Sequence, residues 1–75
     1  MQGAIVIMDK TFFKVKIDTN RGYMDGYICL NDVDMFRECN NDCNVTIVDT
    51  AYHTYCIYMK FNDFAKIMLE HFNIK

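Results

Sequence analysis

A strict alternation of side chains in Thr11–Asp18 is the feature that most limits how this chain can fold. Phe13, Val15 and Ile17 fall on one side of an extended segment, and mostly polar residues fall on the other. Successive side chains of a β-strand point to opposite faces of the sheet. The segment is therefore predicted to be a strand with one buried face and one exposed face.

The segment Gly3–Met8, which precedes this strand, is a continuous apolar run rich in β-branched residues. A run of this kind suits a strand that is buried on both faces, so we expect a central strand. Asp9 and Lys10 are predicted to form the tight turn that joins the two strands.

Two turn signals follow, at Asn20–Gly22 and at Asp25–Gly26. Gly22 suits the left-handed position of a three-residue hairpin loop, whereas Asp25–Gly26 suits a two-residue type I′ turn. We favour the turn at Asn20–Gly22, with a strand over Tyr23–Leu30 and a bulge at Gly26.

The segment after this strand is predicted to be a short helix. Asn31 is a suitable N-cap, and the carboxylates that follow it would lie in the first turn, near the positive end of the helix dipole. Val33 and Phe36, three residues apart, supply a short apolar stripe. The helix is expected to end near residues 40–41.

Two further strands are predicted at Asn44–Asp49 and Tyr52–Lys60, and the last segment is the clearest helix, with Asn62 as its N-cap. Its apolar residues follow the spacing of an amphipathic helix, so this stripe must be buried on the sheet. The stripe consists of Phe64, Ile67, Met68, His71 and Phe72.

The predicted order βββαββα indicates the α+β class. We expect a single domain over residues 1–75, with an antiparallel-rich sheet of about five strands packed by the C-terminal helix and one short helix. A domain of this size buries only about 60% of the surface that its unfolded chain exposes, so its stability is expected to be marginal.

Composition narrows the class of protein. Hydrophobic residues make up 52% of the chain and the net charge is −2, which excludes disorder and leaves no general basic excess for nucleic acid. No apolar run is long enough for a signal peptide or a membrane span, so a cytoplasmic protein without a membrane partner is expected. In that reducing compartment the cysteines are predicted to be free and to pack as small hydrophobic residues.

Several side chains could bind zinc or act as a thiol nucleophile, namely Cys29, Cys39, Cys43, Cys56, His53 and His71. The odd spacing of His53 and Cys56 on a predicted strand turns their side chains to opposite faces, which is poor for chelation. No metal, cofactor or catalytic residue is therefore expected, and a small zinc or thiol protein is the last of the alternatives.

Two surfaces are candidates for binding. One is the outer sheet face, where aromatic rings and lysines alternate as in sheet-based single-strand binders; it comprises Phe12, Lys14, Lys16, Tyr23 and Tyr27. The other is an acidic patch that could dock on a basic protein, comprising Asp32, Asp34, Glu38 and Asp42.

The leading hypothesis is a non-enzymatic protein-binding module that occupies a surface of a larger partner. The surplus of Tyr, Phe and Met favours it, because interface cores are enriched in these residues. A homodimer built through Tyr-rich strands is a further expectation. Size and acidity also fit the inhibitors that phages and other mobile elements direct at host machinery such as defence systems. The alternative is a small nucleic-acid-binding protein that uses the outer sheet face.

Overall fold

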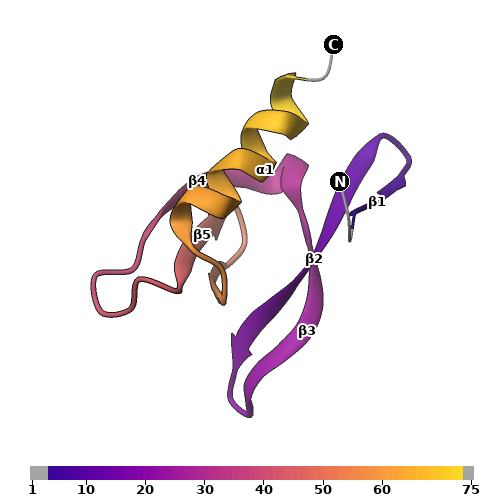
Figure 1. The fold of residues 1–75 in the computed structure, drawn as a ribbon. Coiled ribbons are helices and arrows are strands. Elements are labelled where there is room, and N and C mark those ends of the chain that lie inside the picture. The colour runs from indigo at the N-terminus through magenta and orange to yellow at the C-terminus, as the bar shows by residue number, and fades with distance from the viewer. Residues whose placement is uncertain (1–3, 74–75) are drawn as a thin grey trace.

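The computed structural model describes residues 4–73, which form one antiparallel sheet of six strands and a C-terminal helix (Figure 1). The elements are β1 (Ala4–Ile7), β2 (Lys10–Thr19), β3 (Gly22–Cys29), the single 3-10 turn η1 (Leu30–Asp32), β4 (Val33–Glu38), β5 (Thr46–Thr50), β6 (Thr54–Ile57) and α1 (Phe61–Asn73). The α+β class is confirmed. The sheet has one strand more than expected, and α1 is the only α-helix within residues 4–73.

Strand β2 organises the sheet because three other strands pair with it. β3 pairs along most of its length, from Phe12 to Thr19. β1 pairs with its beginning and β6 pairs with it at Ile17. Both of these contacts overlap the β3 pairing, so β1 and β6 share the opposite edge of β2, one near each end. The sheet then continues from β6 through β5 to β4.

The core lies between one face of this sheet and α1. Its members come from β2, β3, η1, β5, β6 and α1, so no element could bury its apolar residues alone. They are Phe13, Val15, Ile28, Leu30, Val48, Ile57, Phe64 and Met68. The Phe36 ring of β4 packs against Phe61 and Phe64 of α1, with ring centroids 5.4 Å and 5.2 Å apart. We call the sheet face away from α1 the outer face.

The short helix predicted after Asn31 is wrong, because only η1 is helical there and Val33–Glu38 is strand β4. The pairing of β4 with β5 shifts register between Val33 and Met35, which marks a β-bulge. The extra residue lets Val33 and Phe36 both pack against the core although they are three apart. A bulge in a strand can therefore give the same three-residue spacing of buried side chains as an amphipathic helix.

The prediction of a central, doubly buried strand at Gly3–Met8 is also wrong. Gly3 lies outside the described residues, and β1 pairs with β2 alone, at the rim of the sheet. Ile5, Val6 and Ile7 are all exposed. The turn is one residue earlier than expected, at Met8 and Asp9, whose φ angles of 51° and 66° are both positive.

The predicted hairpin of β2 and β3 is confirmed, with Asn20 and Arg21 in the loop and Gly22 at φ 89°. Gly26 is not a bulge, because it pairs in register with Val15. It makes room instead for Ile17: a Cβ at position 26 would lie 2.8 Å from the Ile17 Cδ1 atom. The C-terminal helix is also confirmed, although it begins at Phe61, before the predicted cap. Its stripe is not buried throughout, because Phe72 at its C-terminal end is 55% exposed.

Candidate functional site

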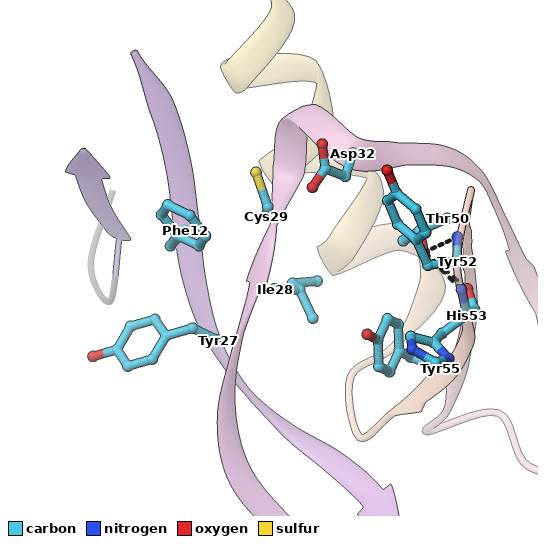
Figure 2. A pocket seen from close by; sticks show the side chains of 9 residues that line it. All are labelled: Phe12, Tyr27, Ile28, Cys29, Asp32, Thr50, Tyr52, His53 and Tyr55. Atoms are coloured by element: carbon cyan, nitrogen blue, oxygen red, sulfur yellow. Dashed lines mark hydrogen bonds between the residues drawn. The ribbon is translucent and has the colours of Figure 1, made fainter. Parts of the chain in front are cut away.

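An open groove of about 340 Å³ that is lined by several aromatic residues lies beside the end of β3. Figure 2 shows one wall formed by the β2–β3 hairpin and the other by the turn between β5 and β6. The groove is lined by Phe12, Tyr27, Ile28, Cys29, Asp32, Thr50, Tyr52, His53 and Tyr55. β3 pairs with β2 alone among the described strands, so its other backbone edge is open beside the groove.

The Thr50 side chain fixes the wall that carries Tyr52 and His53. Its hydroxyl donates to the His53 carbonyl at 3.0 Å and accepts from the backbone N–H groups of Tyr52 and His53 at 3.2 and 3.1 Å. The His53 ring then rests on the Tyr55 ring, with centroids 5.8 Å apart. A polar turn thus presents adjacent aromatic rings to the groove.

The opposite wall is fixed by strand pairing and by Asn31. Phe12 and Cys29 are directly paired across β2 and β3. The Asn31 side chain accepts a hydrogen bond from the backbone N–H of Thr11 at 2.9 Å, which ties η1 to β2. Asp32, in the same 3-10 turn, lines the groove between the two walls (Figure 2).

A second hollow of about 230 Å³ continues the groove across the outer face toward β1. It is lined by Ile5, Ile7, Phe12 and Tyr27, and the last two also line the groove. Register explains this continuity, because Ile5 of β1 pairs with Phe12 of β2, which pairs with Cys29 of β3. The two hollows therefore meet at Phe12 and Tyr27, and we call the surface that lines both of them, from β1 to the β5–β6 turn, the groove face.

The five residues predicted on the outer sheet face do share that face, since they alternate along β2 and β3 in register. Only Phe12 and Tyr27 belong to the groove face. Lys16 is engaged elsewhere: its Nζ lies 2.8 Å from the Asp25 carboxylate across the strand pair. This hydrogen bond, supported by the charge of Lys16, lowers the pKa of Asp25.

Tyr23 lies at the far end of the hairpin from the groove. Its ring packs on Tyr58, with centroids 5.4 Å apart. Partial removal from water raises the pKa of Tyr23, and the negative charge of Asp18 raises it further. Tyr23 is thus a packing residue that joins β3 to the chain after β6.

The four residues of the predicted acidic patch are all exposed, but they do not lie on one short helix. Asp32 lies in η1 and Asp34 in the bulged part of β4, while Glu38 ends β4. Asp42 follows in the next loop, where its carboxylate accepts the Asn44 N–H at 2.9 Å. Within β4 alone, a rise of about 3.3 Å per residue places Asp34 and Glu38 roughly 13 Å apart. Of the four, Asp32 alone lines the groove.

Sequence reasoning missed most of the groove face. The apolar run at Gly3–Met8 predicts a buried strand, whereas Ile5 and Ile7 are exposed; the predicted strand Tyr52–Lys60 includes Tyr52 and His53, which instead lie in the turn before β6. A usable signal was present in Thr50-Ala51-Tyr52-His53, because a threonine hydroxyl can close a short turn in place of a ladder.

The four cysteines are free thiols, and Cys43 is exposed while the others are half-buried. Cys29, Asp32 and His53 line the same groove but stand apart on its two walls and η1 (Figure 2). Across residues 4–73, no three His, Cys, Asp or Glu side chains come together as a metal-binding group.

Comparison with protein-family models, with curated proteins and with solved structures finds no match to this chain. No helix in the described part of the chain is long and apolar enough to cross a membrane.

Proposed function

We propose that this chain is a non-enzymatic protein-binding module that acts by occupying a surface of a larger protein partner, and that the partner docks on the groove face. The observation that carries this proposal is the continuity of the two hollows through Phe12 and Tyr27. Contiguous exposed apolar surface on a small protein is typical of an interaction site.

The composition of the groove face suits a protein partner. Tyrosine supplies both an apolar ring and a hydrogen-bonding hydroxyl, and aromatic residues are frequent among the side chains that dominate binding energy. The open edge of β3 adds backbone donors and acceptors, which an extended segment of a partner can use by strand addition. Tyr52 and His53 would then stand over that segment from the opposite wall.

The test is affinity capture with the immobilised chain, followed by titration of the purified captured protein. The variant Tyr27→Glu with Tyr52→Glu places charge on both sides of the groove. Loss of such anchors costs about 2 kcal/mol or more, which is roughly a 30-fold weaker Kd. The matched control is Leu69→Glu, because Leu69 is 62% exposed on α1, away from the groove.

The proposal predicts that wild type and the Leu69→Glu variant capture the same protein and that the double variant does not. Equal capture by all three chains contradicts the assignment of the groove face. The narrower version, an inhibitor that a phage or mobile element directs at host machinery, rests on size and acidity alone. The identity of the captured protein decides it.

Nucleic-acid binding by the outer face is the alternative, and the sharing of that face by Phe12, Lys14 and Tyr27 favours it. Its weakness is that Asp25 offsets the charge of Lys16. The variant Lys14→Glu with Lys16→Glu separates the two proposals. Loss of binding to a fluorescent single-stranded oligonucleotide, together with a flatter salt dependence, would support the alternative. Protein capture that survives this change supports the groove face.

A further inference from the structure

The unpaired edge of β1 conflicts with the composition of that strand. Residues that are apolar on both faces belong in the middle of a sheet. Here the strand is at the rim, where Ile7 is 54% exposed, Val6 is 68% exposed and Met8, in the turn, is 90% exposed. Figure 1 shows β1 at the edge of the sheet with no helix over it.

β1 also lacks the features that protect sheet edges from pairing. Natural edges carry charges, prolines or bulges. The segment from Ala4 to Met8 has no charge and no proline, and its pairing with β2 runs in register without a shift. Of the other two edges within residues 4–73, β4 has a bulge and carries Asp34, whereas β3 carries Asp25 toward its hairpin loop and is open where it borders the groove.

We propose that a second copy of this chain covers β1, by antiparallel pairing of the two β1 strands about a two-fold axis. An antiparallel two-fold pairing puts residues of the same face opposite each other, so Val6 of one copy can face Val6 of the other. Ile5 of each copy then faces Ile7 of its partner. Both faces of the new strand pair match apolar with apolar side chains.

A second copy suits this edge better than an unrelated strand. The two copies each carry a net charge of −2, but β1 contributes no charge to the junction, so like charges do not meet there. Because β1 carries no charge, it cannot select an unrelated strand by charge complementarity. In a two-fold dimer, the same surface of each copy forms the contact, so β1 only has to be complementary to itself. Pairing also adds stability to a small domain, because it favours the folded state by mass action.

The pairing goes beyond the proposed function. It uses the backbone edge of β1, whereas partner binding centres on the groove beside β3, and only Ile5 and Ile7 contribute to both surfaces. The Ile5–Ile7 contact would make the groove faces of the two copies continuous across the axis. A homodimer would therefore present two grooves, and a partner with two docking segments would bind it more tightly than it binds a single copy.

The first experiment is sedimentation of the full chain over a series of concentrations. The proposal predicts that the mass rises from that of one chain, 8.9 kDa, to twice that value. In the variant Val6→Lys, two like charges meet at the axis, so association should weaken by about tenfold or more. Because Val6 is exposed in the single chain, circular dichroism should show an unchanged fold. Leu69→Lys, on the exposed face of α1, is the matched control and should associate as wild type does.

A charge-swap mixture tests the register. V6K alone and V6E alone should each associate more weakly than the wild type, while an equal mixture should associate more tightly than either, because opposite charges then face each other. A wild-type chain that stays at 8.9 kDa at every concentration overturns the pairing. So does association of V6K as tight as that of the wild type, or an equal loss in Leu69→Lys. Failure of the mixture to associate overturns the Val6 register. None of these results depends on capture of a protein by the groove.

Discussion

The part of the sheet around β5 and β6, which we call the covered end, and the β1 rim, which we call the uncovered end, contain the same kinds of residue but differ in how far these residues are buried. Val48 of β5 and Ile57 of β6 are completely buried, whereas Val6 and Ile7 of β1 are more than half exposed. The difference is the helix: Phe64 and Met68 of α1 join Val48 and Ile57 in the core, and no member of that core comes from β1. Burial is thus decided by what covers a strand and not by how apolar the strand is.

The comparison has a functional consequence. The covered end supplies stability, since its eight core residues link six elements. The uncovered end supplies the open β1 edge and part of the groove face, whose other wall is the turn between β5 and β6. The predictions that follow test this division of roles. Each compares two similar changes, either at the two ends or at two residues or turns of the same kind.

The largest difference is expected between the two isoleucines. Ile57→Ala removes fully buried methyl groups and should lower the free energy of unfolding by about 2–5 kcal/mol. Ile7→Ala changes an exposed side chain and should stay within about 0.5 kcal/mol. Urea denaturation followed by circular dichroism measures both, at a protein concentration low enough to keep the chain monomeric. An equal loss for the two variants would contradict the division.

The buried end also contains one polar side chain whose removal should be costly. Thr46 is fully buried and its hydroxyl donates to the Met59 carbonyl at 2.7 Å. Thr46→Val leaves that carbonyl without its partner and should lower the free energy of unfolding by about 1–3 kcal/mol. The control is Thr54→Val, because the exposed Thr54 hydroxyl donates to Asp49 at 2.7 Å and water can replace it. A Thr54 effect as large as that of Thr46 would show that burial is not the cause.

The two hairpin turns should respond with opposite signs. Met8 and Asp9 have positive φ angles that ordinary residues adopt at a cost of about 1 kcal/mol each. Replacing them with Asn and Gly, the preferred type I′ pair, should raise the free energy of unfolding by about 1 kcal/mol. Gly22→Ala should lower it by about 1 kcal/mol, since φ is 89° although no atom lies within 4 Å of the added Cβ. Thermal denaturation of both variants gives the two signs, and a loss at Met8 and Asp9 would contradict the turn geometry.

The smallest effect is expected at the exposed pair of Lys16 and Asp25. Lys16→Gln removes the main cause of the lowered Asp25 pKa, so that pKa should rise toward its usual value, as a carboxyl titration by NMR would show. A carboxyl whose folded pKa is lowered adds stability above its unfolded pKa and loses it as the pH falls through the folded pKa. The variant should therefore lose part of that acid-side dependence. Lys14→Gln, which removes a weaker cause, should shift the pKa less, and a reversed order would contradict the assignment.

The local sequence pattern predicted the elements whose side chains keep one periodicity along their whole length. The alternation of β2 and the five-residue stripe of α1 each repeat with one period, and both elements are present. Within the groove, the same alternation placed Phe12 and Tyr27 on one face. It could not supply Tyr52 and His53, because the distance between β3 and the β5–β6 turn depends on how distant segments pack.

The helix expected after Asn31 is a case in which the local sequence pattern predicts the wrong secondary structure. Val33 and Phe36 are three residues apart, which is a helical spacing on an isolated chain. Pairing with β5 imposed a strand instead, and the bulge at Asp34 absorbed the odd residue. Backbone hydrogen bonds to a neighbouring strand therefore outweighed a weak local preference.

By itself, the sequence determined the α+β class, the β2–β3 hairpin with its turn before Gly22, and the amphipathic C-terminal helix. Those features follow from side-chain period and from backbone conformations that single residues permit. Only the tertiary structure decided that β1 lies at a rim, that β4 is a strand, and that a groove forms beside β3. The physical reason is that coverage and pairing depend on contacts between residues far apart in the chain, which no local window contains.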